Sequence, residues 1–123
     1  MITHIKTVAV YVEDQERALA FYTEKLGFEV RFKAPMGPKA HWIELAPKRA
    51  QTCLVIYPRS MMPDWPQLKP SVVFSCDDVE ATYQELSARG VTFTEPPRRM
   101  AWGIFAKFVD VDENEFIATS PLK

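Results

Sequence analysis

Two stretches of the chain share the same order of apolar and polar positions. In residues 8–30 (VAVYVEDQERALAFYTEKLGFEV), alternating apolar residues are followed by a polar turn, a helical spacing of apolar residues and then Gly27. The same order recurs in residues 72–93 (VVFSCDDVEATYQELSARGVTF), where Gly90 takes the corresponding place. Alternation predicts a strand, whereas a spacing of three to four residues predicts a helix. Because the two glycines stand about half the chain apart, the pattern indicates an internal repeat.

Each repeat is predicted to fold as a strand, a helix and three further strands. In the first repeat we expect a helix at 15–25, begun by Asp14 as N-cap, and strands at 7–12, 28–33, 41–45 and 52–57. In the second we expect a helix at 79–89 and strands at 71–76, 91–94, 100–109 and 115–120. Loops are expected where prolines gather, at 34–39, 58–69 and 95–99, because proline lacks a backbone donor.

This order of elements predicts an α+β fold built from two tandem βαβββ modules. The two sheets are expected to form curved half-barrels with helices on their outer faces and a cleft between their inner faces. A length of 123 residues suits one domain, with module one at about 1–58, a linker at 59–69 and module two at about 70–123.

The composition of the chain argues against certain binding partners and indicates a cellular compartment. Fifteen basic residues against sixteen acidic ones give a net charge near −1, which argues against a nucleic-acid or anionic-membrane surface. No apolar run approaches the ~20 residues that cross a bilayer, and the N-terminus lacks a signal-peptide pattern. Cys53 and Cys76 lie in apolar strands without CxxC spacing, as free thiols of a reducing compartment do. We therefore expect a cytoplasmic protein.

Four local motifs, taken in order, resemble the vicinal-oxygen-chelate superfamily of glyoxalases, bleomycin-resistance proteins and extradiol dioxygenases. They are V-x-V-x-D followed by F-Y (Val10, Val12, Asp14, Phe21, Tyr22), L-G-F at 26–28, A-x-G-V at 88–91, and an F-x-D-P-D-G-N turn at 108–114. In that turn Val111 replaces the family's proline and Glu113 replaces its glycine. The resemblance covers nearly the whole chain and implies the same two-module fold.

The resemblance also implies a divalent metal held by one side chain from each of the first, fourth, fifth and eighth strands. The matching positions in this chain are Thr7, Leu54, Ser71 and Ile117. None is histidine or a carboxylate, the ligands that such a Lewis-acid site needs. His4 lies an odd number of residues from Thr7, and hence on the other strand face, and Glu115 is expected to be a solvated charge at a strand start. We therefore predict no metal and no cofactor.

Without a metal, the expected cleft is an apolar basin with aromatic walls. The predicted ligand-binding residues are Thr7, Trp42, Leu54, Tyr57, Ser71, Trp102, Phe105 and Ile117. Positions two residues away are expected on the same face, namely Ala9, Tyr11, Ile56, Val73, Ser75 and Thr119, with Glu44 and Met100 completing the walls. Trp42 and Trp102 would clamp a flat ligand, and Arg31, Arg98 or Arg99 would meet a carboxylate. The alternatives are that both tryptophans are plain core and that Glu44 and the arginines are solvated.

Three functions remain compatible with these residues. The principal prediction is a protein that binds a small, aromatic or apolar molecule in a metal-free cleft, resembling the drug-sequestering branch of the family. The second is a metal-independent or atypical-metal enzyme of the glyoxalase or isomerase type, with Glu44 as catalytic general base; dioxygenase activity is less favoured because it relies on the metal. The third is an accessory dimer without a small ligand. The resemblance also implies a symmetric homodimer.

Overall fold

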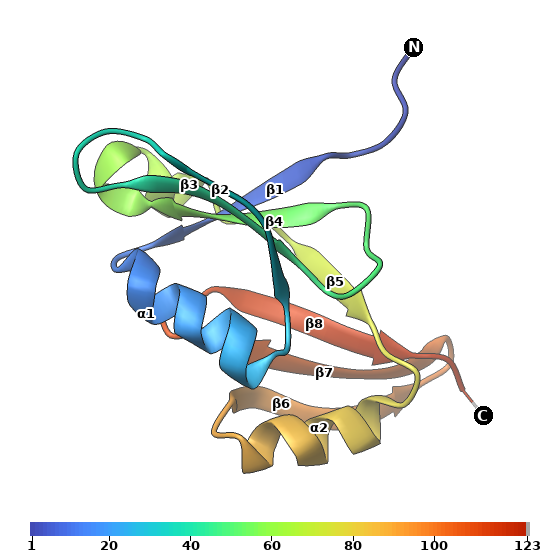
Figure 1. The fold of residues 1–123 in the computed structure, drawn as a ribbon. Coiled ribbons are helices and arrows are strands. Elements are labelled where there is room, and N and C mark those ends of the chain that lie inside the picture. The colour runs from blue at the N-terminus through green and yellow to red at the C-terminus, as the bar shows by residue number, and fades with distance from the viewer. Residues whose placement is uncertain (123) are drawn as a thin grey trace. The chain divides into compact units, whose positions relative to one another are not determined.

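The computed structural model describes residues 1–122 and divides into two units, Met1–Pro70 and Ser71–Lys123 (Figure 1). The first unit contains β1 (Thr7–Val12), α1 (Gln15–Ala20), β2 (Glu29–Pro35), β3 (His41–Ala46) and β4 (Cys53–Pro58). The second contains β5 (Val72–Ser75), α2 (Val79–Ala88), β6 (Thr92–Met100), β7 (Gly103–Val109) and β8 (Glu115–Ser120). The α+β class and the βαβββ order of both modules are confirmed. No helix within residues 1–122 is long and apolar enough to cross a membrane.

Both helices begin and end where local chemistry predicts. The Asp14 carboxylate accepts from the backbone N–H groups of Glu16 at 2.9 Å and Arg17 at 3.1 Å, and Asp78 caps α2 in the same way. Gly27 and Gly90 have φ values of +76° and +92°, a conformation that glycine adopts without steric cost. The first helix changes to a π-helical turn at Phe21–Lys25, within the predicted range.

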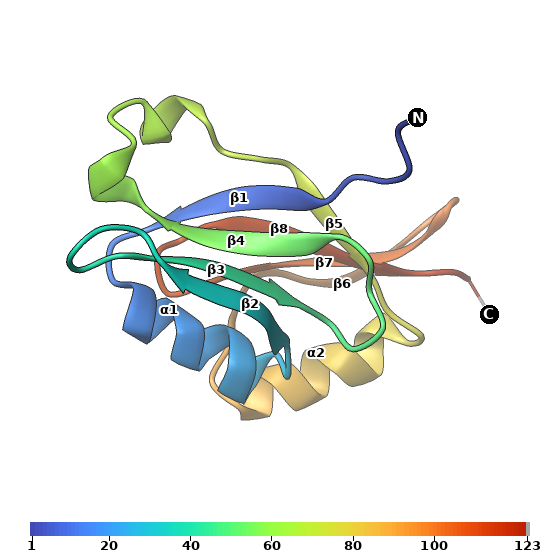
Figure 2. The same ribbon diagram turned by 45° about the horizontal axis from the view of Figure 1, so that its top comes forward.

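The strands of the first unit lie in the order β1-β4-β3-β2, which Figure 2 shows side by side. β1 runs parallel to β4, with Tyr11 opposite Tyr57, and β3 runs antiparallel to β4, with Glu44 opposite Val55. Paired residues share a sheet face, so the register defines two faces. The face toward α1 is aliphatic and buried, and consists of Val10, Val12, Ile43, Leu45, Leu54 and Ile56. The opposite face, called here the aromatic face, carries Tyr11, Phe32, Trp42, Glu44 and Tyr57.

The strands of the second unit lie in the corresponding order, β5-β8-β7-β6. Its sheet packs aromatic rings where the sheet of the first unit packs aliphatic side chains. The ring centroids of Phe74 and Phe116 are 5.1 Å apart, and those of Phe108 and Phe116 are 5.5 Å apart. Tyr83 of α2 meets Phe93 of β6 edge-on at 4.8 Å, so the helix packs on this ring cluster.

Three predicted boundaries are wrong. Residues 95–99, expected as a proline-broken loop, continue β6 to Met100, with register shifts between Phe93 and Glu95 and between Glu95 and Arg98. β6 is an edge strand, and an edge tolerates prolines because one side of it needs no donors. β7 therefore begins at Gly103 rather than at residue 100, and residues 101–102 form the turn. β2 extends through Ala34 and Pro35, which pair with β3, into a segment expected as a loop.

Candidate functional site

Three half-buried rings on the aromatic face hold one another in position. Tyr11 and Tyr57 meet edge-to-face with centroids 5.9 Å apart and an interplanar angle of 79°. Trp42 meets Tyr57 in the same way, at 6.2 Å and 82°. Aromatic pairs prefer this geometry, because the positive edge of one ring faces the negative face of the other. Phe32 lies on β2, directly opposite Glu44 of β3, and leaves 53% of its surface exposed beside these three rings.

Glu44 lies among these rings and is only 9% exposed. The indole N–H of Trp42 donates to its Oε2 at 2.8 Å. The cross-strand neighbours of Glu44 are Phe32 and Val55, neither of which is polar. No lysine, arginine or histidine within residues 1–122 forms an ion pair with it. The face therefore presents one buried carboxylate in an aromatic surrounding.

The structure separates Leu54 from the other residues predicted for the first unit. Thr7, Trp42 and Tyr57 lie on the aromatic face, as expected. Leu54 pairs with Val8 and Leu45 and lies on the helix side, as does Ile56, so the expectation that both share a face with Thr7 is wrong. The apolar run TCLVIY does not reveal which of its alternate positions faces the helix, and only the parallel register with β1 decides it.

The structure brings together most of the residues predicted for the second unit. Val73 lies opposite Ile117, and Phe105 lies opposite Thr119, so these four share one face. Trp102 stands in the turn before β7, is 63% exposed, and stacks on Phe105 at 5.6 Å. Ser71 lies exposed just before β5. The clamp between Trp42 and Trp102 stays a prediction, since the two residues belong to different units.

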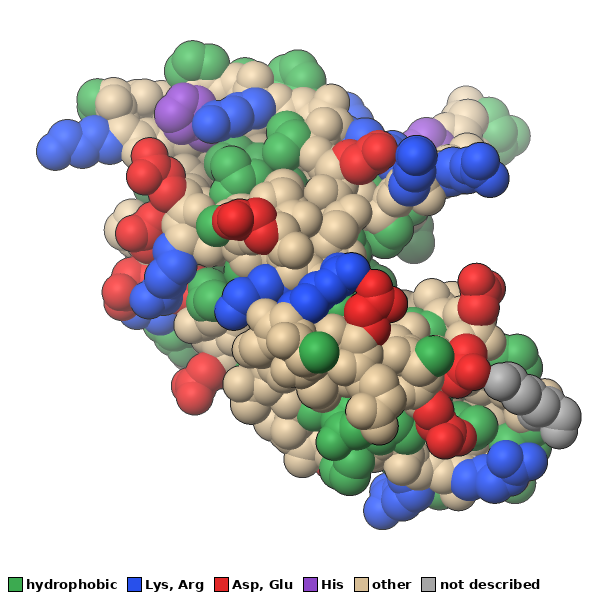
Figure 3. All heavy atoms as spheres, turned by 60° about the horizontal axis from the view of Figure 1, so that its bottom comes forward, with side chains coloured by type: hydrophobic (Ala, Val, Ile, Leu, Met, Phe, Trp, Pro, Cys, Tyr) green, Lys and Arg blue, Asp and Glu red, His purple; other side chains and the backbone are tan. Residues whose placement is uncertain are grey.

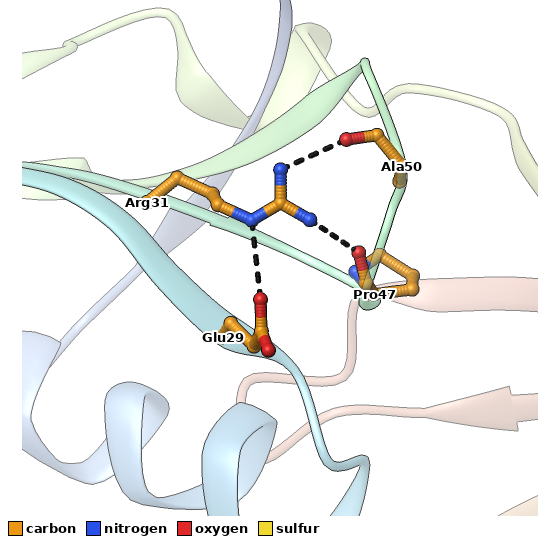
Figure 4. A network of polar contacts seen from close by, with 4 residues as sticks. All are labelled: Glu29, Arg31, Pro47 and Ala50. Carbon is orange, nitrogen blue, oxygen red and sulfur yellow. Dashed lines mark hydrogen bonds and ion pairs between the residues drawn. The ribbon is translucent and has the colours of Figure 1, made fainter.

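Two of the candidate arginines have structural partners. Arg31 donates from Nη1 to the carbonyl of Ala50 at 2.9 Å and from Nη2 to that of Pro47 at 2.7 Å, and its Nε lies 3.5 Å from Glu29 (Figure 4). The guanidinium thus fixes the turn between β3 and β4. Arg98 lies over the ring of Phe105, with Cζ 5.2 Å from the centroid. For Arg99 the structure shows an exposed position on β6.

A pocket of about 750 Å³ on the helix side of the first unit was missed by the sequence reasoning. Glu16 and Leu19 of α1 line it, together with Lys33, Lys39 and His41 of the β2–β3 hairpin. Figure 3 shows acidic, basic and apolar side chains interspersed on one face of the molecule. The sequence did carry one signal for the pocket. His41 and Ile43 are two residues apart on a strand, so their side chains share the sheet face opposite to that of Trp42. The segment around Gly37, however, reads only as a loop.

Gln15 also lines this pocket and makes three hydrogen bonds. Its Nε2 donates to the carbonyls of His41 at 2.6 Å and Ile56 at 2.8 Å, and its Oε1 accepts from the His41 N–H at 3.0 Å. Gln15 therefore joins the start of α1 to β3 and β4.

The pKa of the Cys76 thiol lies above its usual range. Burial raises the pKa of the Cys76 thiol, a hydrogen bond with Thr82 partly offsets this, and the neighbouring Asp77 raises it further. The thiol is therefore protonated at neutral pH and is a poor nucleophile there.

The residues at the four family metal positions do not fit a divalent cation. Leu54 carries no donor atom and lies on the helix side, on the sheet face opposite to that of Thr7. Ile117 also carries no donor atom, and Thr7 and Ser71 offer only hydroxyls. Within residues 1–122 no three histidine, cysteine or acidic side chains gather in a group that would hold a metal ion. That the protein works without a cofactor stays a prediction.

Comparison with known proteins agrees with this fold. The model of the Glyoxalase/Bleomycin resistance protein/Dioxygenase superfamily matches residues 4–117. The chain is 51% identical over 117 residues to the uncharacterized protein YetH of Bacillus subtilis (strain 168), covering 95% of this chain and 98% of YetH. A member of the same superfamily from Sphaerobacter thermophilus DSM 20745 has 33% identity and a TM-score of 0.86, with 97% of this chain and 98% of that one covered. TnmS3, an antibiotic binding protein from Streptomyces sp. CB03234, has 34% identity and a TM-score of 0.83, with 98% of each chain covered. The chain belongs to the glyoxalase/bleomycin resistance protein/dioxygenase superfamily.

Proposed function

We propose that this protein binds a small aromatic or apolar molecule on the aromatic face of its first unit, in a site without a metal. The observation that carries the proposal is the set of Tyr11, Trp42 and Tyr57, whose edge-to-face contacts hold three rings beside the exposed Phe32. Small-molecule sites are predominantly apolar and aromatic, with few polar groups that fix orientation. Glu44 supplies such a group here.

The likeness to TnmS3 supports the same proposal. TnmS3 is described as an antibiotic binding protein, and its 34% identity extends over 98% of this chain. Ring surfaces that are already held in place lose little conformational freedom when a flat molecule stacks on them, which favours binding. The second unit adds another aromatic surface, in which the exposed indole of Trp102 stacks on Phe105.

Tryptophan fluorescence tests the proposal with Trp42 as the reporter. A double variant, Trp65→Phe with Trp102→Phe, leaves Trp42 as the single indole of the chain. We expect flat aromatic compounds, including aromatic antibiotics, to quench it saturably and aliphatic compounds of equal size to leave it unchanged. Tyr57→Leu in that background should weaken binding about fivefold, since a lost aromatic contact is worth about 1 kcal/mol beyond its area.

A matched control uses the tryptophan of the linker. Trp65 lies under the guanidinium of Arg59, whose Cζ is 4.7 Å from its centroid, and Trp65→Phe alone should leave the affinity unchanged. Unsaturable quenching, or equal affinity in the Tyr57→Leu variant, would contradict the proposal. Chemical conversion of a bound compound that stops in Glu44→Gln would instead support the enzyme with Glu44 as general base.

We also propose that the protein assembles as a symmetric homodimer. The family resemblance motivates the assembly, and exposed apolar side chains in both units support it. They include Phe32 and Val30 on β2, Val73 on β5, and Met100 and Trp102 next to β7.

A further inference from the structure

We infer that the molecule bound on the aromatic face carries a positive charge, a protonated amine or a quaternary ammonium group, which pairs with Glu44. The inference rests on the proposed function and adds to it the chemical class of the ligand. Its starting point is Glu44, an acidic residue that is only 9% exposed among the rings of the aromatic face.

The environment of Glu44 leaves its charge without a partner in the described chain. Oε2 accepts one hydrogen bond, from the Trp42 indole at 2.8 Å, and residues 1–122 provide no ion pair to either oxygen. Burying a carboxylate is unfavourable unless an opposite charge or several hydrogen bonds compensate it. A cationic ligand would supply the missing charge.

Among residues 1–122, the strands that pair around Glu44 place no cationic side chain toward it. β1 and β4 contribute only uncharged residues to the aromatic face, including Tyr11, Val55 and Tyr57. On β2, Arg31 is engaged by the carbonyls of Pro47 and Ala50. Lys33 pairs with Ile43 and so lies on the helix side. The charge of Glu44 therefore acts on whatever binds the face.

The rings beside Glu44 favour the same kind of ligand. The faces of tryptophan and tyrosine rings carry negative electrostatic potential and attract ammonium groups within about 6 Å. Trp42 donates its N–H to Glu44, and Tyr57 meets Trp42 edge-on, so both rings lie next to the carboxylate. Ring faces and carboxylate together select a cation over a neutral group of the same shape.

The test compares three aryl compounds of one shape: an aryl trimethylammonium cation, its neutral tert-butyl isostere and the corresponding sulfonate anion. On the wild-type protein, isothermal titration calorimetry should show the cation binding about tenfold more tightly than the isostere, the equivalent of about 1.4 kcal/mol, and the anion most weakly. Glu44→Gln keeps an acceptor for the Trp42 N–H and the side-chain shape, and it should abolish the preference for the cation while leaving the neutral isostere bound.

Glu16→Gln is the matched control, because it makes the same chemical change at an exposed carboxylate that lines the pocket on the other side of the sheet. It should retain the preference for the cation. Loss of the preference in Glu16→Gln alone would place the cation in that pocket and overturn the inference.

The outcomes separate this inference from the proposed function. Equal binding of the cation and its isostere to the wild-type protein would overturn the inference and leave the proposed function standing. Failure of every aromatic compound to bind would contradict both. Comparing the three compounds on the wild-type protein tests the inference even if Glu44→Gln does not fold, because the order of their affinities is measured on the native chain.

Discussion

Gln15 shows how far a single side chain can determine the packing of a helix on a sheet. Its amide satisfies two carbonyls and one N–H at the ends of β3 and β4, from the first residue of α1. Gln15→Ala should lower the free energy of unfolding by about 2–3 kcal/mol, because each lost hydrogen bond costs about 1 kcal/mol and leaves backbone groups unpaired. Urea denaturation measures this change.

The control for Gln15 is Gln67→Ala in the turn at Trp65–Gln67. Gln67 is exposed, and within residues 1–122 its side chain makes no hydrogen bond, so its replacement should change stability by less than about 0.5 kcal/mol. Equal effects of the two substitutions would mean that the Gln15 contacts contribute nothing.

At the scale of elements, the sequence predicted the strands and helices better than it predicted which side chains share a face of a sheet. Alternation along HWIEL placed Trp42 and Glu44 together on one face, and the parallel pairing of β5 with β8 places Val73 with Ile117 as expected. Leu54 was misplaced because β4 is buried on both faces, so its residues carry no alternation to read. The face of such a strand depends on its register with a strand distant in the chain, which no local pattern encodes.

The continuation of the edge strand β6 through residues 95–99 was missed for a different reason. Proline ends most strands, so Pro96 and Pro97 read as a loop. In the structure they lie in an edge strand, at a register shift between Glu95 and Arg98 that leaves both prolines outside the ladder pairs, so their missing N–H groups break no ladder hydrogen bond. Prolines at an exposed edge also hinder pairing with the edge of another molecule. Their position therefore suggests that they protect this sheet from aggregation.

Substitution at Pro96 tests that protective role. Pro96→Val restores a donor and a β-favouring side chain to the outer strand, so we expect faster aggregation at 37 °C with little change in the urea midpoint. Light scattering over time measures the rate. Pro121→Val, beyond the end of β8, makes the same change outside any strand and should aggregate like the wild type. A Pro96→Val variant as soluble as this control would show that the proline serves no protective role.

At the scale of the whole molecule, the internal repeat lies in the pattern of positions and not in the residues that fill them. The first unit packs aliphatic side chains such as Ile56 and Leu45 beneath its helix. The second packs the rings of Phe74, Phe108 and Phe116 instead. Aliphatic and aromatic side chains fit the same alternation of apolar and polar positions, because cores tolerate exchange of apolar residues when volume and pattern are kept. For that reason spacing was enough to predict the fold, whereas the site depends on individual residues such as Glu44.

The proposed homodimer makes a prediction at this same scale. A net charge near −1 opposes association of two copies only weakly, and Val73 leaves 56% of its surface exposed on the edge strand β5. We expect sedimentation at micromolar concentration to give about twice the 14.1 kDa chain mass. Val73→Lys, which places a charge where an apolar contact would form, should shift the protein toward the monomer at the same concentration.

Leu68→Lys provides the comparison, since Leu68 is 43% exposed but lies in the turn region before β5 rather than on a strand. It should sediment like the wild type. A monomeric wild-type protein at micromolar concentration would contradict the dimer. A dimer that persists in Val73→Lys would exclude β5 from its interface and direct attention to the other exposed apolar side chains, those of Trp102 and Met100 beside β7.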